Sequence, residues 1–380
     1  MTNATHLSGV DAPERSGQKS VEDLSQGQLF RLRFRKHKLA MLGLYFIIGA
    51  FLMAGFAEFL APHDPGKVNA TYQYAPPQMP RLMDADGNFH LRPFVYPMER
   101  SFDIATGTRT WTFDTDTHLP LTLFGKSDSY DFWGLITWDR HLFGTAEGVW
   151  YPLGTDRLGR DTLSRIMHGA RVSLTVGMLG VAISLVLGVL IGGVAGYFGG
   201  WVDNGVQRLT EVAIAIPSLP LWMALSAALP TWWSPITVYF AITLILSAIG
   251  WTGMAREVRG RFLALREEEF VMAARLSNCS QWRIITRHMV PSVYSHIIAS
   301  ASLAIPAMIL AETALSFLGI GLRAPVISWG VLMQEAQNIH SVALYPWLLL
   351  PGVFVILTVL AFNFVGDGLR DAADPHNHHV

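Results

Sequence analysis

Residues 260–293 read GRFLALREEEFVMAARLSNCSQWRIITRHMVPSV and lie between two long apolar runs. The acidic residues at 267–269 favour the start of a helix, because they face the unpaired N–H groups of its first turn. Asn278 tolerates the left-handed conformation that often ends a helix. Ser280 is suited to cap a second helix, which Pro291 closes. The pattern predicts two short helices joined by a turn at Asn278.

The two predicted helices also differ in what they present to their surroundings. Ala273 and Ala274 have almost no side chain, so another backbone can approach them closely. The second helix carries apolar residues on one face and arginines on another, at helical spacing. The apolar face has Trp282, Ile285 and Met289, and the charged face has Arg283 and Arg287. With seven arginines between residues 256 and 291, the segment is expected to receive a polar partner.

The composition is that of a membrane protein. Of 380 residues, 51% are hydrophobic and 15% are charged, whereas soluble proteins carry about 25% charged residues. The net charge of -1 and the lack of a basic, aromatic-rich tract give no reason to expect nucleic acid as a partner. The single cysteine, Cys279, excludes an intramolecular disulfide and is interpreted as a small loop residue.

Hydropathy predicts an all-α membrane protein with six transmembrane helices. The first covers residues 39–61, and the others lie at 172–196, 209–229, 236–255, 292–319 and 346–365. Around them we expect an N-terminal tail (1–38), an external insertion (62–150), an interfacial amphipathic segment (151–171), a core domain of five spans (172–366) and a C-terminal tail (367–380).

Charge predicts the orientation of these spans. The basic run RLRFRKHK at 31–38 directly precedes the first span, and basic residues next to a span favour the cytoplasmic side. Counting spans from there places the segment at 256–291 and both termini in the cytoplasm. The segment's arginines agree with that side.

The insertion is predicted to contain β-structure. Residues 110–113 and 121–124 alternate in polarity and are predicted to be strands with a turn between them. Asp114, Asp116 and His118 are candidate metal ligands, although the solvated edge of a hairpin is the favoured interpretation. Gly125 to Ser127 resembles a phosphate loop only superficially, because the first glycine of that motif is replaced by Pro120. We find no nucleotide site in the chain.

Two glycine-containing stretches carry further signals. In YPLGTDRLGRDTLSRIMHGARVSL, residues 151–174, Asp161 is a candidate N-cap for an amphipathic helix at the membrane interface. In the second span, Gly188, Gly192 and Gly196 recur every four residues. They form a flat stripe on which another helix can pack closely.

The order Ala-Ala-Arg, a turn residue and then Trp-Arg-Ile-Ile-x-Arg-His-x-x-Pro resembles the EAA loop of permease subunits of ABC importers. The similarity is to the C-type permeases of the dipeptide, oligopeptide and nickel family, and the residues from Gly154 to Arg165 and GYFGGWVDN resemble that family too. Asn278 stands where the family has Gly, and Met272 where it has the Glu that names the motif.

This resemblance implies a type I importer permease that is not itself an enzyme and binds no cofactor, ATP being bound by partner subunits. The implied partners are a second homologous permease, two cytoplasmic ABC ATPases, an extracytoplasmic binding protein and the bilayer of the bacterial inner membrane. Peptides are the first implied substrate, with oligosaccharides and nickel chelates as alternatives. The residues expected to contact the ATPase are Glu269, Ala273, Ala274, Arg275, Asn278, Trp282, Arg283, Arg287 and Pro291.

Polar residues within the spans leave two interpretations open. Glu312 and Glu211 are costly in hydrocarbon and must face protein or water. Together with Pro306, which should kink the fifth span, they either line a translocation path or hold neighbouring helices together. An ion-coupled secondary transporter is a less favoured alternative, because no internal repeat is visible. A membrane-anchored enzyme is disfavoured for want of a catalytic cluster.

Overall fold

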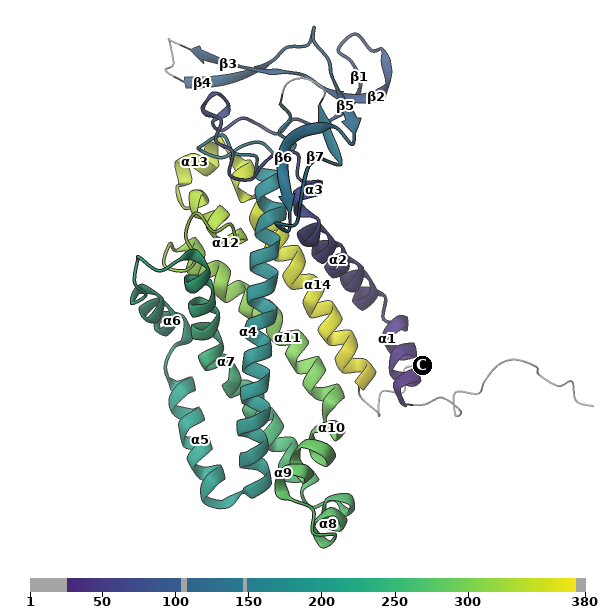
Figure 1. Ribbon diagram of the computed structural model, residues 1–380, viewed down its shortest axis with the longest axis vertical. Helices are drawn as coiled ribbons and strands as arrows, with labels where there is room; N and C mark the ends of the chain where they lie inside the picture. The colour runs from purple at the N-terminus through teal and green to yellow at the C-terminus, as the bar shows by residue number, and fades with distance from the viewer. Residues whose placement is uncertain (1–25, 104–107, 146–148, 374–380) are drawn as a thin grey trace, which may run out of the picture.

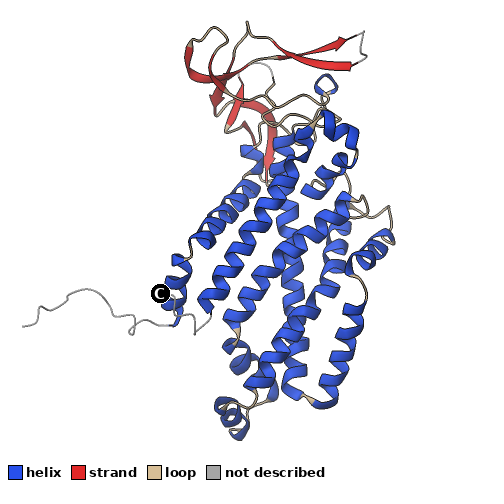
Figure 2. Cartoon of the chain, turned by 180° about the vertical axis from the view of Figure 1, so that it is seen from behind, coloured by secondary structure: helices blue, strands red, loops and turns tan. Residues whose placement is uncertain are grey.

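The computed structural model describes residues 26–103, 108–145 and 149–373. Long helices form a bundle, with the strands at one end and helix α8 (Glu269–Leu276) at the other (Figure 1). We call these the sheet end and the α8 end. The view from behind shows the same separation of strands from helices (Figure 2). Most of the predicted N-terminal tail and the terminal His376, His378 and His379 lie outside the described residues.

Five described helices are long and apolar enough to cross a membrane, and a bent pair provides a sixth span if it is counted as one. The prediction of an all-α membrane fold is therefore confirmed. The five are α2 (Lys38–Gly55), α4 (Thr162–Phe198), α7 (Pro235–Leu265), α11 (Tyr294–Phe317) and η5 with α14 (Pro346–Leu349 and Leu350–Ala373). The bent pair is α5 (Gly200–Ala215) and α6 (Ser218–Ala227).

The predicted continuous span at 209–229 is wrong in shape, because α5 and α6 meet at an angle of 80°. Ile216, the residue before Pro217, has an extended backbone. Proline disfavours the helical conformation in the residue that precedes it, and it donates no backbone hydrogen bond. Pro217 therefore accounts for the break between α5 and α6.

Residues 162–171, expected to form a separate interfacial helix, belong instead to the 37-residue helix α4. No proline interrupts residues 162–198. At 1.5 Å per residue α4 is about 55 Å long, whereas the hydrocarbon core of a bilayer is about 30 Å thick. The helix is thus long enough to extend beyond both faces of a membrane. Its predicted N-cap is confirmed, because Asp161 Oδ2 accepts the Ser164 N–H at 2.8 Å.

The glycine stripe on α4 packs against α7, as predicted. A Cβ added at Gly192 would lie 2.2 Å from the Ala255 carbonyl oxygen, and one at Gly188 would lie 2.6 Å from Met254 Cβ. The two helices therefore touch along their backbones. The fourth span, expected at 236–255, is also longer than predicted, since α7 continues without interruption to Leu265.

The insertion holds the strands. The structure has a four-stranded antiparallel sheet in the order β1-β2-β5-β8 and two separate hairpins, β3-β4 and β6-β7. Both predicted strands exist, as β4 and β5, but they do not pair with each other: β4 pairs with β3, and β5 pairs with β2 and β8. The strands are β1 (Arg81–Met83), β2 (Phe89–Val95), β3 (Met98–Asp103), β4 (Thr108–Phe113), β5 (Leu119–Leu123), β6 (Lys126–Phe132), β7 (Ile136–Arg140) and β8 (Phe143–Thr145).

Short helices complete the chain. Preceding α4 are α1 (Gln26–Lys36), α3 (Ala57–Leu60) and η2 (Ala70–Tyr72). At the α8 end lie α8 (Glu269–Leu276), α9 (Gln281–Arg283), the π-helical turn η3 (Ile284–Met289) and α10 (Val290–Ser292). Between α11 and η5 lie α12 (Trp329–Met333), η4 (Gln334–Gln337) and α13 (Ile339–Leu344).

Candidate functional site

Helices α8 and α9 form the hairpin that the sequence predicted at the α8 end (Figure 1). Asn278 has a φ of 55°, in the left-handed region. The Cys279 N–H donates to the Ala274 carbonyl at 3.1 Å, which closes the end of α8. The Ser280 hydroxyl accepts the Arg283 N–H at 3.4 Å and caps α9. The turn at Asn278 and the cap at Ser280 are both confirmed.

One side of this hairpin packs on its own chain. Val271 is fully buried, and Ala274, Ile285 and Met289 are at most 8% exposed. They join a core that includes Phe262 and Tyr197. Ala274 therefore faces the bundle and not an incoming partner.

The other side of the hairpin is open. Met272 and Leu276 lie four residues apart on α8, so they share a face, and Leu276 is 89% exposed. Trp282 is 58% exposed and does not share the buried side with Ile285 and Met289, contrary to the predicted apolar face. Several polar residues and two small ones are exposed as well: Glu269, Ala273, Arg275, Asn278, Arg283, Arg287 and Pro291. We call Met272, Ala273, Leu276 and Trp282 the hairpin surface.

The hairpin is firmly joined to the long helices. Its first arm follows directly from α7, and its second leads through η3 and α10 into α11. Beside it, Arg259 of α7 forms a two-pronged ion pair with Asp203 of α5, with Nη2 2.6 Å from Oδ2. The Arg275 guanidinium lies 5.0 Å from the ring centroid of Tyr197, in α4. The hairpin is thus continuous with α7 and α11 and contacts α4, while α7 is paired with α5.

Glu312, in α11, is fully buried. Its Oε1 accepts hydrogen bonds from the hydroxyls of Ser316 and Ser328, each at 2.8 Å. The Ser173 hydroxyl of α4 lies 3.4 Å from Oε2 and accepts the Trp329 N–H at 3.0 Å. In this conformation the carboxyl group joins α4, α11 and the start of α12.

The other two residues proposed for a path lie elsewhere. Pro306 is buried within α11. The Glu211 side chain is 63% exposed on α5 and pairs with Arg208 at 3.0 Å. The structure does not bring Glu211, Pro306 and Glu312 into one cluster.

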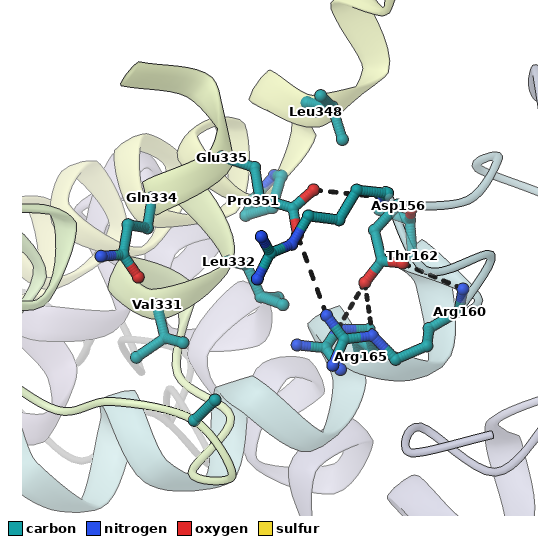
Figure 3. A pocket seen from close by; sticks show the side chains of 12 residues that line it. Asp156, Arg160, Thr162, Arg165, Val331, Leu332, Gln334, Glu335, Leu348 and Pro351 are labelled. Carbon is teal, nitrogen blue, oxygen red and sulfur yellow. Dashed lines mark hydrogen bonds and ion pairs between the residues drawn. The ribbon is translucent and has the colours of Figure 1, made fainter. Parts of the chain in front are cut away.

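At the sheet end, a small pocket of about 60 Å³ is lined by charged residues (Figure 3). Asp156 lies between Arg160 Nε, at 2.6 Å, and Arg165 Nε, at 3.6 Å. Glu335 of η4 reaches Arg157 Nε at 3.2 Å. Burial, and then the charge of nearby Asp156, raise the pKa of Glu335 above its ordinary value. These ion pairs join the residues before α4 to η4.

Residues 154–165, which include Gly154 and Gly159, pack closely against other parts of the chain. Gly159 has a φ of +71°, and a Cβ there would lie 1.9 Å from the Asn69 carbonyl oxygen. Thr155 is fully buried; its hydroxyl accepts the Ala75 N–H at 2.8 Å, and its carbonyl accepts the Trp347 indole N–H at 2.9 Å. The stretch therefore connects the start of the insertion to the last span.

A wider opening of about 290 Å³ lies nearby, between the α6–α7 turn and the loop after α11. Its lining includes Trp233, Val238, Arg323 and Pro325. This opening could not be predicted from the sequence, because its walls come from segments far apart in the chain.

Five apolar spans, a bent helix pair that counts as a sixth, and a hairpin between α7 and α11 define a multi-pass membrane protein. Residues 188–379 match the model of the family described as binding-protein-dependent transport system inner membrane component. Residues 25–77 match the N-terminal TM domain of oligopeptide transport permease C. The chain belongs to this family of ABC importer permeases, as the hairpin sequence indicated. Strands β1–β8 lie between the two matched regions.

Three relatives match most of the chain. The dipeptide transport system permease protein DppC of Bacillus subtilis is 32% identical over 345 residues, which cover 90% of this chain and 83% of the relative. The oligopeptide permease OppC of Haemophilus influenzae is 41% identical over 236 residues, 61% of this chain and 72% of the relative. The glutathione permease GsiD of Pectobacterium atrosepticum is 36% identical over 246 residues, 65% of this chain and 79% of the relative.

Proposed function

We propose that this chain is a transmembrane subunit of an ATP-driven importer that moves peptides across the bacterial inner membrane. It would act with a second homologous permease, two cytoplasmic ATPase subunits that bind and hydrolyse ATP, and an extracytoplasmic binding protein. Both termini and the α8 end would lie in the cytoplasm, and the sheet end outside. The chain itself would catalyse no reaction.

The observation that carries this proposal is the hairpin surface. Leu276 and Trp282 are 89% and 58% exposed although they are large and apolar. Met272 and Leu276 share one face of α8, and an exposed apolar patch of this kind is typical of an interaction site. With Arg283 and Arg287 beside them, they suit a partner surface that has an apolar groove and acidic groups.

The attachment of the hairpin supports a mechanical role. Closure of an ATPase dimer on ATP would push the hairpin, and the push would pass through Arg259 and Asp203 to α5 and α7, and through η3 and α10 to α11. Rigid-body movement of these helices would switch access from one face of the membrane to the other. Glu211, exposed on α5, would be available to the second permease.

The substrate class rests on the relatives, whose names specify dipeptides, oligopeptides and glutathione. Peptide uptake is therefore the activity to assay. In proteoliposomes that contain all four kinds of subunit, we expect uptake of a labelled peptide to require ATP and every subunit. Uptake without the ATPases would contradict the proposal and favour a secondary transporter.

Leu276→Asp tests the docking surface. Loss of an apolar anchor at an interface costs about 2 kcal/mol or more, which corresponds to about a 30-fold weaker association. We expect that loss in the affinity of the purified permease pair for the ATPase. The control is Leu91→Asp, because Leu91 is 90% exposed at the sheet end and should leave ATPase binding unchanged. Equal ATPase binding by both variants would overturn the assignment of the docking surface.

A further inference from the structure

Three metal-ligating side chains meet in the insertion, far from the hairpin. They are Asp84, which follows β1, His90 within β2, and His118, which precedes β5. One ligand atom from each lies within 4.8 Å of the other two. Strands β1, β2 and β5 are neighbours in one sheet, so the fold itself brings the three residues together.

His118 is the member whose environment is otherwise unexplained. Its Nε2 atom is buried and has no hydrogen-bond partner among the residues that the structure describes. A buried polar atom without a partner is costly and requires an explanation. The His118 ring lies 5.1 Å from that of His90 and 4.6 Å from that of Phe94, measured between centroids. The aromatic rings hold both imidazoles beside the carboxylate.

Asp84 is held in position by hydrogen bonds to both of its carboxylate oxygens. Its Oδ1 accepts the N–H groups of Asp86 at 3.0 Å and Asn88 at 2.7 Å. Its Oδ2 lies 2.9 Å from His90 Nε2. These contacts fix the carboxylate beside the two histidines.

We propose that Asp84, His90 and His118 form a binding site for a borderline divalent cation of the Zn²⁺ type. Two imidazoles and one carboxylate are ligands that Zn²⁺ accepts, and a fourth tetrahedral position remains for water. Ca²⁺ and Mg²⁺ prefer oxygen ligands throughout and are disfavoured by the two nitrogens. Ligand atoms about 2 Å from zinc lie about 3.3 Å apart, so binding would draw His118 inward by rotation of its side chain.

The ion would tie together three strands from which the β3–β4 hairpin emerges. The carboxylates flagged by the sequence near His118 are not part of this site. Asp114 instead accepts the Asp116 N–H at 3.0 Å, within a turn. The sequence named His118 as a candidate ligand but grouped it with Asp114 and Asp116. Asp84 and His90 come close to His118 only in the folded sheet.

The test is zinc binding by the full-length protein in detergent, purified with a tag that contains no histidine. His376, His378 and His379 are replaced by alanine in every sample, so that the C-terminal residues cannot contribute. We expect one Zn²⁺ per chain by elemental analysis. Replacing an outer-shell partner lowers metal affinity 10- to 100-fold, so His118→Ala, which removes a ligand, should weaken binding by more than about 100-fold in competition with a chelating dye.

The matched control is Asp114→Asn with Asp116→Asn, which should bind Zn²⁺ as tightly as the parent. Should His118→Ala fail to fold, His90→Gln and the visible spectrum of Co²⁺ bound to the parent provide the same information. A four-coordinate Co²⁺ spectrum and weak binding by His90→Gln support the site. Substoichiometric zinc in the parent, or unchanged affinity in a folded ligand variant, overturns it.

Discussion

At the sheet end, charged side chains fasten the insertion to the bundle, whereas at the α8 end an apolar core supports the hairpin and leaves its other face open. Arg171 of α4 bonds both carboxylate oxygens of Glu58 at 2.8 Å and lies 4.2 Å from the ring of Trp133, in the insertion. It also donates to the Ala54 carbonyl at the end of α2. The charged and polar groups of Arg171 and Glu58 thus find their hydrogen-bond partners within the chain.

The hairpin end is arranged differently. Its buried residues are apolar, and the nearby ion pair of Asp203 with Arg259 lies between α5 and α7 and not on the hairpin. Leu276 and Trp282 are left exposed. The two ends therefore differ in what fastens them, ion pairs at the sheet end and apolar packing at the α8 end. Large apolar side chains are exposed at both ends, Leu276 at 89% and Leu91 at 90%, so what distinguishes the hairpin is its continuity with α7 and α11.

The close contact between α4 and α7 runs between the two ends of the bundle. A substitution that forces these helices apart should have the largest effect on stability. Alanine at position 192 would place a Cβ 2.2 Å from the Ala255 carbonyl oxygen. Such overpacking costs about 1–3 kcal/mol, even though alanine is favoured over glycine in helices by about 1 kcal/mol. We expect Gly192→Ala to lower the thermal midpoint in detergent and to impair ATP-dependent uptake.

Gly253→Ala is the matched control for Gly192→Ala, because Gly253 also lies within a span and has no atom within 4 Å of an added Cβ. That variant should be as stable as the parent or more so. If Gly192→Ala were equally well tolerated, α4 and α7 would not pack backbone to backbone.

Two ion pairs of similar exposure allow the ends to be compared directly. Glu58 and Arg171 are 13% and 27% exposed, and Asp203 and Arg259 are 12% and 24% exposed. Hydrogen bonds to charged groups contribute about 1.5–3 kcal/mol. Glu58→Gln and Asp203→Asn should therefore destabilise to a similar, moderate degree, while Asp203→Asn alone should uncouple ATP hydrolysis from peptide uptake. Equal uncoupling by both variants would contradict the distinction between the ends.

The Glu58 pair also predicts a pH dependence. Burial raises the pKa of Glu58, but the hydrogen bonds and charge of Arg171 outweigh it and hold the pKa below its ordinary value of 4.5. The stabilisation is fully present above that ordinary value and is lost as the pH falls through the lowered pKa. The difference in thermal midpoint between the parent and Glu58→Gln should shrink in acid. A difference that grew in acid would show that the carboxylate is not paired.

Local chemistry could be predicted from the sequence. Asn278, Ser280 and Asp161 act through backbone groups within a few residues, and each is found in its predicted role. The glycine stripe of α4 could also be predicted, because helical periodicity fixes which residues share a face.

Features that depend on distant segments could not be predicted. Ala274 was expected to contact a partner and is buried, and Trp282 was expected to share a face with Ile285 and Met289 and is exposed. The direction of these side chains depends on how α8 and η3 pack in the core that includes Phe262. The pairing of β5 with β2 and β8 depends on the sheet topology, and sequence spacing favoured its neighbour β4. The burial and hydrogen bonding of Glu312 likewise depend on serine hydroxyls from α4 and from the start of α12.

The central claim is that the hairpin surface is the face that a partner covers. Cysteine can be placed at two positions of nearly equal exposure, Leu276→Cys at 89% and Leu91→Cys at 90%, in a Cys279→Ala background that has no other thiol. Maleimide labelling is then timed for the permease pair alone and for the same pair with ATPase subunits bound. The account predicts that the ATPases slow labelling at position 276 by at least about tenfold and leave position 91 unchanged. Equal labelling at position 276 with and without bound ATPase would contradict it.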